Sequence, residues 1–330
     1  MAPAEQYGYA VARLRAMSGR LLEEALLLRV LECEDLESAI KVLGETVYSG
    51  WLMELKGIGE FDKAIEAELL HVFEEVHKFV PDAALVELCR LPYDFHNVKV
   101  LVKGTLLVRE GGERRFDLLT KLGNIPVDDL ITAMETEDYR LLPFGLHRLV
   151  PGCFTVWEQS RDVLELEKLL DEGLFEAMRL GAEASGVESA VLWVRARIDA
   201  ENVRSLLRLK RMNVETSAAA GYLHAGGLIS KDRLLSVFTE PPESWAKLLA
   251  FADVSSILFS DDKTYFFTCL MVPSEDCVAV STILADALEY EKYPSSTMGI
   301  MVQINTILSF VPMLILILFP ILPGLLSGRL

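Results

Sequence analysis

The chain has 330 residues, of which 51% are hydrophobic, and it carries a formal net charge of −17 at pH 7. Its length predicts two or three domains of ordinary size. Its acidity argues against a general nucleic-acid-binding protein, because phosphate backbones select basic surfaces. The five cysteines are scattered and odd in number, which indicates a reducing compartment rather than a disulfide framework.

Helical periodicity dominates residues 9–215. An apolar stripe within 36–43 predicts a short helix, and Gly44 follows it as a residue type that favours helix C-terminal caps. Between 61 and 80, apolar residues recur at helical spacing with Glu and Lys between them, and Pro81 predicts the end of that helix. Alternating patterns typical of strands are scarce, so the sequence predicts an all-α fold.

One short segment occurs three times at intervals of 104 residues. The copies share a glycine, an aliphatic residue, an acidic residue and a leucine at fixed spacing. The matching positions are Gly19, Gly123 and Gly227; Leu21, Ile125 and Ile229; Glu24, Asp128 and Asp232; and Leu26, Leu130 and Leu234. Each copy predicts a turn glycine followed by a helix start, with the acid in the first turn, where the helix dipole stabilises negative charge.

A second segment occurs twice, at an offset of 105 residues. The matching residues are Asp94 and Asp199, Asn97 and Asn202, Val98 and Val203, the cations Lys99 and Arg204, Leu101 and Leu206, and the cations Lys103 and Arg208. A general similarity of amphipathic helices would explain the leucines but not the Asp, Asn and Gly positions. We interpret both signals as one internal repeat, which divides the chain into units near 1–112, 113–217 and 218–330.

Two interpretations are open for the Asp-x-x-Asn element. Its two cations lie one helical turn apart and could dock an acidic partner or form ion pairs between units. Alternatively, Asp94 or Asp199 caps the N-terminus of a helix whose cationic face is solvated, which we favour because exposed charges contribute little. The candidate contact residues are Asp94, Asn97, Lys99, Lys103, Asp199, Asn202, Arg204 and Arg208, together with Arg13 and Arg15 near the N-terminus.

The C-terminal part departs from the repeat. A third Asp-x-x-Asn segment is expected near residue 304 and is absent there. Residues 293–328 carry no charge, and the apolar stretch 307–326 has the length of about 20 residues that spans a bilayer core, although three prolines interrupt it. Three explanations are open: a membrane anchor, a hydrophobic tail that is buried or covered by a partner, and a translation of the wrong reading frame or a mis-joined terminus.

No pattern in the sequence predicts catalysis or cofactor binding. A G-x-x-x-x-G-K-[ST] phosphate loop is absent, so no nucleotide is expected by that route. His71 and His77 resemble the histidine pair of a zinc protease, but six residues separate them, about 240° around a helix, so they do not converge on a metal ion. The remaining histidines lack a nearby nucleophile or acid pattern. We expect no catalytic, cofactor or metal site.

The sequence resembles the C-subunit family of the V-type ATPases of bacteria and archaea, whose eukaryotic counterpart is the d subunit. The motifs that carry the resemblance are the segment Tyr7–Met17, the segment Thr46–Tyr48, the Asp-x-x-Asn segments that begin at Tyr93 and Ile198, and Gly226-Gly227. The similarity covers roughly residues 7–250, and the order and spacing of the motifs are more specific than any single motif.

This resemblance implies a funnel of helices with pseudo-threefold symmetry. Family members sit on the cytoplasmic face of the membrane rotor ring, hold the foot of the rotor shaft and transmit torque between ATP chemistry and ion passage. The implied partners are therefore the rotor shaft subunits and the membrane rotor ring, with no nucleic acid and no nucleotide, and the implied position is peripheral to the membrane. The uncharged segment 293–328 departs from the charged helix that closes the family's last unit.

Two alternatives belong to other classes of protein. A free-standing helical scaffold that binds unrelated partners would purify without ring or shaft subunits. A membrane protein anchored through 307–326 would resist carbonate extraction, which releases a peripheral subunit.

Overall fold

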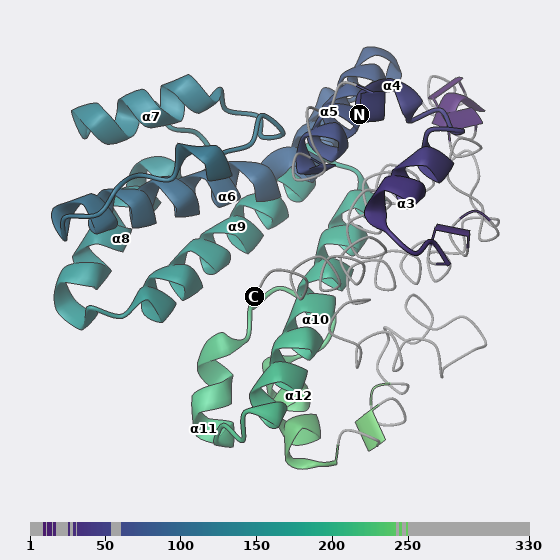
Figure 1. The fold of residues 1–330 in the computed structure, drawn as a ribbon. Coiled ribbons are helices and arrows are strands. Elements are labelled where there is room, and N and C mark those ends of the chain that lie inside the picture. Colours follow the sequence, from purple (N-terminus) through teal and green to yellow (C-terminus); the bar gives the residue numbers. More distant parts are fainter. Residues whose placement is uncertain are drawn as a thin grey trace. The chain divides into compact units, whose positions relative to one another are not determined.

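The computed structural model describes residues 32–53 and 61–241, together with single positions between 9 and 30 and between 244 and 249. Secondary structure in these residues is helical, with no strand (Figure 1). This confirms the predicted all-α class. Several predicted features lie outside the described residues, namely Gly19, Arg15, the uncharged segment 293–328 and the candidate anchor 307–326 within it.

The helices follow the predicted boundaries where the sequence contains clear signals. Helix α3 (Leu36–Leu43) covers the predicted apolar stripe, and the carboxylate of Asp35 accepts the Ser38 backbone N–H at 2.7 Å as an N-terminal cap. Helix α5 (Phe61–Phe79) ends two residues before Pro81, as predicted. The short helix α4 (Ser49–Met53) lies between them and packs on α5.

The remaining helices follow one another along the chain. They are α6 (Ala83–Arg109), the 3₁₀ turn η2 (Phe116–Leu118), α7 (Val127–Thr136), α8 (Leu146–Ser160), α9 (Val163–Ser185), α10 (Glu188–Arg211), α11 (Thr216–Ala219), the 3₁₀ turn η3 (Ala220–Tyr222) and α12 (Lys231–Thr239). Helix α6 is central among them, because α7, α8, α9 and η2 all pack against it (Figure 1). The buried residues of α6 include two polar side chains, Asp94 and Asn97, as well as apolar ones.

The two helix starts predicted after Gly123 and Gly227 are both present. Helix α7 begins directly after Pro126, and α12 begins directly after Ser230, whose hydroxyl accepts the Arg233 backbone N–H. Each helix carries an acidic residue in its first turn, as the helix dipole favours. The two described copies of the glycine segment are therefore turn-to-helix junctions.

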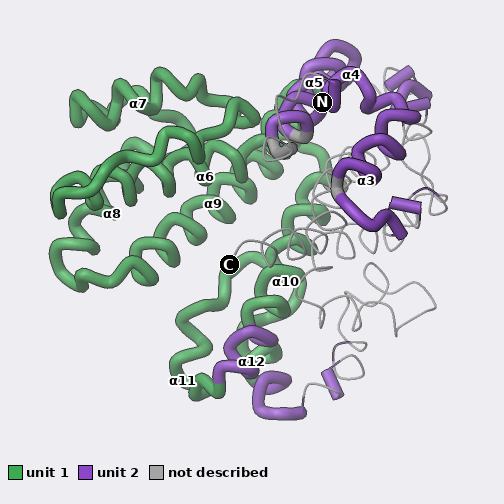
Figure 2. Tube along the Cα trace, viewed as in Figure 1, with its two compact units in different colours: residues 1, 82–205, 213–235 green, residues 2–81, 206–212, 236–330 purple. Residues whose placement is uncertain are grey.

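The described residues fall into two compact units (Figure 2). One contains residues 82–205 and 213–235, and its fully buried side chains include Phe95, Trp193 and Leu170. The other contains the described parts of 2–81, 206–212 and 236–249, with Phe73 and Trp245 fully buried. These two units do not coincide with the repeat boundaries near 112 and 217, and the arrangement of three pseudo-symmetric units stays a prediction.

Among the described residues, no helix is both long enough and apolar enough to cross a bilayer.

Candidate functional site

The two Asp-x-x-Asn segments lie in the middle of long helices, Asp94 and Asn97 in α6 and Asp199 and Asn202 in α10. All four side chains are completely buried. The prediction that Asp94 or Asp199 caps a helix N-terminus is therefore wrong, because each lies more than ten residues inside its helix. A buried carboxylate or amide needs hydrogen-bond partners, and both segments find them in a loop that follows their helix.

In the first segment, the partners come from residues 120–125. The carboxylate of Asp94 accepts the backbone N–H of Ile125 at 2.8 Å and the side-chain amide of Asn124 at 2.7 Å. Asn97 forms two hydrogen bonds with the backbone of Thr120. Its side-chain amide donates to the Thr120 carbonyl at 2.8 Å, and its side-chain oxygen accepts the Thr120 N–H at 2.9 Å. The loop is thus held by α6 at both ends.

In the second segment, residues 224–229 make similar contacts with α10, except that a backbone N–H takes the place of the Asn124 side-chain amide. The carboxylate of Asp199 accepts the backbone N–H groups of Leu228 at 2.7 Å and Ile229 at 3.2 Å. Asn202 donates to the His224 carbonyl at 3.0 Å and accepts the His224 N–H at 2.7 Å. The repeat found in the sequence therefore corresponds to a repeated three-dimensional arrangement.

An arginine one turn before each aspartate completes the arrangement. Arg90 donates through Nε to the Leu122 carbonyl at 2.8 Å, and Arg195 donates through Nη2 to the Gly227 carbonyl at 3.2 Å. Sequence reasoning missed both residues, although their offset of 105 would have revealed them. We name Arg90, Asp94 and Asn97 with loop 120–125 the first anchoring cluster, and Arg195, Asp199 and Asn202 with loop 224–229 the second anchoring cluster.

The glycines of the repeat are explained by the aspartates. A Cβ atom placed on Gly123 would overlap the carboxylate of Asp94, and one placed on Gly227 would overlap the carboxylate of Asp199. Glycine is therefore required at both positions so that the loop backbone can approach the helix. The two described copies of this glycine have equivalent surroundings.

Burial dominates the electrostatics of both clusters. It raises the pKa of Asp94 above its ordinary value and raises the pKa of Asp199 to about 6, because a carboxylate loses its hydration in the interior. The backbone N–H donors and the neighbouring arginines, Arg90 and Arg195, oppose this shift without cancelling it.

The raised pKa of Asp199 predicts an unusual pH dependence of stability. Because the folded protein holds this proton more tightly than the unfolded chain, the burial of Asp199 costs stability at neutral pH, and the cost is relieved as pH falls through about 6. Between pH 7 and pH 5, the free energy of unfolding of the wild type should rise by about 1 kcal/mol relative to Asp199→Asn. Denaturant titrations of both proteins at the two pH values measure this difference.

The comparison with Asp199→Asn isolates this carboxyl group from other titrations. His224, whose pKa burial lowers, contributes a trend of opposite sign, since its stability contribution is lost as pH falls. His224 is present in both proteins and cancels in the difference. Parallel pH profiles of wild type and variant would contradict the prediction.

The predicted cations have different surroundings in the two copies. Lys99 and Lys103 form ion pairs across to α9, with Asp171 and Glu167 respectively. In α10, the guanidinium of Arg204 lies 3.0 Å from Glu201 on the same helix, and Arg208 is exposed. The lysines therefore link two helices of one compact unit.

The N-terminal candidate Arg13 lies beside α5. Its guanidinium donates to the Tyr9 hydroxyl at 3.2 Å, lies 3.7 Å from Glu75 and stacks over the ring of Phe79. The other N-terminal candidate, Arg15, lies outside the described residues. A contact of any of these cations with a partner protein stays a prediction.

No group of three or more His, Cys, Asp or Glu side chains in the described part of the chain is arranged to hold a metal ion. Cys89 and Cys153 are buried, and burial raises the pKa of each thiol to about 12. Such thiols are poor nucleophiles at neutral pH. In both anchoring clusters, buried polar side chains bind the backbone of the chain itself.

A comparison with protein families matches residues 10–293 to the family described as ATP synthase (C/AC39) subunit. The match extends beyond the roughly 7–250 expected from the motifs and ends where the uncharged C-terminal segment begins.

Individual relatives have related names. The C subunit of the A-type ATP synthase of Methanocaldococcus jannaschii is 25% identical over 67% of this chain and 58% of its own length. The C subunit of the V-type ATP synthase of Thermus thermophilus is 24% identical over 70% of this chain and 71% of its own length. The C subunit of the V-type sodium ATPase of Enterococcus hirae is 22% identical over 74% of this chain and 73% of its own length. The chain thus spans less than two thirds of the first of these relatives.

The family match covers most of the chain, and the names of these relatives agree with the resemblance seen in the motifs. The chain belongs to the ATP synthase (C/AC39) subunit family.

Proposed function

We propose that this chain is a non-catalytic adaptor of the central stalk in a rotary V-type ATPase. In this role it rests on the membrane rotor ring, holds the foot of the rotor shaft and transmits torque between ATP chemistry and ion transport. The observation that carries the proposal is the family match over residues 10–293, together with relatives named as subunits of A-type and V-type ATP synthases and of a sodium ATPase. The chain would lie peripherally on the cytoplasmic face of the membrane.

The anchoring clusters support a mechanical role. A part that transmits torque must resist deformation, and closely packed helices have low compressibility. Each cluster adds directional hydrogen bonds between a long helix and a loop that follows it, from Asp94 and Asn97 in α6 and from Asp199 and Asn202 in α10. Because the four side chains that form these bonds are completely buried, water competes little for them, and the bonds favour one conformation of each loop.

The most direct test is a pull-down of this chain from native membranes. The proposal expects ring and shaft subunits of the ATPase to accompany it, and carbonate extraction to release it. Purification of the chain alone would instead support the free helical scaffold, and retention in carbonate-washed membranes would support an anchored protein. Either result would contradict the peripheral adaptor.

A second test concerns the basic residues of α10. If Arg204 and Arg208 dock an acidic partner surface, the variant Arg204→Ala/Arg208→Ala should weaken assembly about fivefold per arginine, and ion pumping coupled to ATP hydrolysis should fall with it. The matched control is Arg140→Ala, since Arg140 is exposed and pairs with Asp138, two residues away. Normal assembly and coupling in the double variant would dismiss the docking role.

A further inference from the structure

The two anchoring clusters differ in the residue that the asparagine holds. Asn97 bonds the backbone of Thr120, whose hydroxyl does not titrate in the physiological range. Asn202 bonds the backbone of His224, whose imidazole is the side chain that titrates near neutral pH. Because both asparagines use only backbone groups, these bonds place no demand on the side chain of the held residue. The second loop, 224–229, therefore carries a titratable group at the position where the first loop has a threonine.

The imidazole of His224 is half-buried and packs against an aromatic ring of α9. Its ring centroid lies 4.6 Å from that of Phe175, and its Nδ1 atom is buried without a hydrogen-bond partner among the described residues. A neutral imidazole tolerates this, because one of its nitrogens carries no proton, whereas an imidazolium carries a proton on both. Protonation would place an N–H donor in the interior without an acceptor, which costs free energy.

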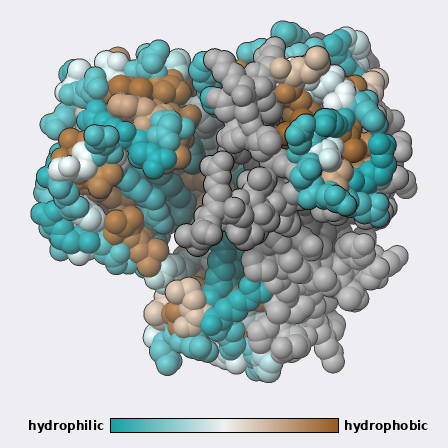
Figure 3. Space-filling view, in the orientation of Figure 1, coloured by the Kyte–Doolittle hydropathy of each residue, from teal (hydrophilic) through white to brown (hydrophobic). Residues whose placement is uncertain are grey.

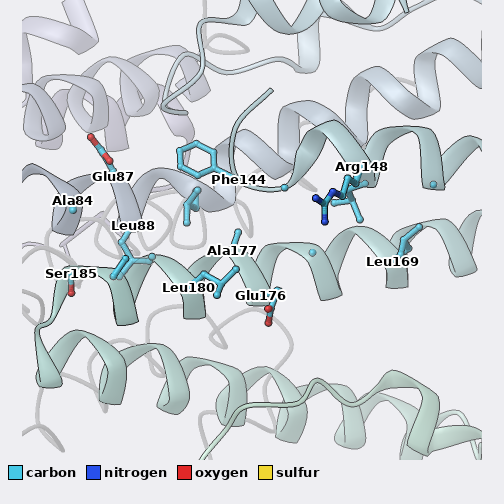
Figure 4. Close-up of a pocket in the computed structure, with 17 residues that line it drawn as sticks. Ala84, Glu87, Leu88, Phe144, Arg148, Leu169, Glu176, Ala177, Leu180 and Ser185 are labelled. Atoms are coloured by element: carbon cyan, nitrogen blue, oxygen red, sulfur yellow. The ribbon is translucent and has the colours of Figure 1, made fainter. Parts of the chain in front are cut away.

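Helix α9 is a fixed support for this ring. On one side of α9, Leu169, Ala177 and Leu180 line an apolar groove together with residues of α6 and α8 (Figure 4). At about 100° per residue, Phe175 lies on the roughly opposite side of the helix. Because α9 is packed on both α6 and α8, separation of the two rings has to come from movement of loop 224–229 and not from movement of α9.

The charged groups around His224 come from three helices. They are Asp171 and Glu172 on α9, Glu201 on α10 and Lys231 on α12. Two of the carboxylates are already engaged, since Asp171 pairs with Lys99 and Glu201 lies 3.0 Å from Arg204. Their attraction for a proton is smaller than the effect of burial, which lowers the pKa of His224 below its ordinary value. The closed loop thus favours the neutral imidazole.

We propose that loop 224–229 is a proton-sensitive latch, which protonation of the His224 imidazole opens while loop 120–125 stays closed. Opening breaks the two hydrogen bonds with Asn202 and lets the imidazolium reach water and the surrounding carboxylates. Ala225 and Gly226 are already exposed, and hydrophilic residues lie at the surface over α12, which follows the loop (Figure 3). The latch is a property of the chain alone and does not rest on the proposed adaptor function.

Asp199, in the same cluster, responds to acid in the opposite direction. Its pKa is raised to about 6, so falling pH relieves the cost of burying its carboxylate and favours the closed loop. The pKa of His224 is lowered, so its contribution to closure is lost as pH falls below the ordinary histidine value. The test therefore compares proteins that share Asp199 and differ only at His224.

The test is hydrogen–deuterium exchange of the full chain at pH 7 and pH 5, expressed as protection relative to an unstructured amide at the same pH. His224→Phe keeps an aromatic ring against Phe175 but cannot take up a proton. Between the two pH values, protection of 224–229 should fall about tenfold more in the wild type than in His224→Phe, because only the wild type acquires an unpaired buried N–H. Protection of 120–125 should change equally in both proteins.

Two further variants connect the response to this imidazole. His224→Thr places the residue type of the first cluster in the second and should behave like His224→Phe. His147→Phe removes an exposed histidine of α8 outside both clusters and should behave like the wild type. Loop 120–125 is a sound reference, because His96, which donates to the Leu118 carbonyl before that loop, can make this bond in either protonation state.

Circular dichroism at both pH values shows which proteins are folded, and either folded variant of His224 is enough to decide. A loss of protection in loop 224–229 that is present in the wild type and smaller in the His224 variants supports the latch. The same change in the wild type and these variants overturns it. A parallel loss in loops 120–125 and 224–229 of the wild type also overturns it, since the opening would then not be confined to the second cluster.

Discussion

Gly227→Ala is expected to lower the free energy of unfolding by about 3 kcal/mol. The new methyl group would overlap the carboxylate of Asp199, which two backbone N–H groups hold in place. Overpacking of this kind costs about 1–3 kcal/mol, and displacement of a charged acceptor from its donors adds a comparable amount. Gly123→Ala should behave similarly, because Asp94 occupies the equivalent position. Chemical denaturation of each purified variant measures the loss.

The cause of this loss can be tested separately from its size. In the background of Asp199→Ala, the cost of Gly227→Ala should shrink by about 1–2 kcal/mol, since the carboxylate that obstructs the methyl group is gone. Gly50→Ala is the matched control: Gly50 lies in α4 with no atom near the position of an added Cβ, and alanine is the better helix former. The free energy of unfolding of the Gly50→Ala variant should not fall below that of the wild type. Additive effects of Gly227→Ala and Asp199→Ala would refute the proposed overlap.

Asn97→Ala and Asn202→Ala should each cost about 2–4 kcal/mol of unfolding free energy. Each substitution removes two hydrogen bonds and leaves a backbone N–H and a carbonyl, of Thr120 or of His224, without the amide that satisfied them. A buried group deprived of its partner costs about 1–3 kcal/mol. The two costs should be similar, because Asn97 and Asn202 each pair in the same way with the N–H and carbonyl of one loop residue. Thermal and denaturant unfolding, compared between the two variants, test this equality.

An exposed amide provides the control for the asparagine variants. Gln159→Ala on α8 removes a solvent-exposed side-chain amide, and its effect should stay within about 0.5 kcal/mol. If Asn97→Ala and Asn202→Ala were as mild as Gln159→Ala, the loops would not depend on these amides. A large loss of unfolding free energy at one site and none at the other would show that the two asparagines match in sequence but do not contribute equally to stability.

Features that depend on local spacing can be predicted from the sequence. Apolar residues at helical intervals predict α3 and α5, and Pro81 predicts where α5 ends, because helix periodicity and proline chemistry depend only on near neighbours. The two offsets of just over a hundred residues identify every aspartate, asparagine and glycine shared by the anchoring clusters, and the motif order identifies the family. A pattern repeated along the chain can be seen without knowing what each residue contacts.

The sequence alone was thus enough to infer the all-α class, several helix boundaries, the repeat and the family. It was not enough to infer the roles of the repeated residues. Asp94 and Asp199 have the sequence pattern of helix caps, but in the fold each is a buried acceptor for a loop about thirty residues away in sequence. The fold also explains why the glycines are needed and joins Arg90 and Arg195 to them. The physical reason is that a hydrogen-bond partner distant along the chain leaves no trace in local periodicity, so the role of each side chain depends on which loop the packed helices bring beside it.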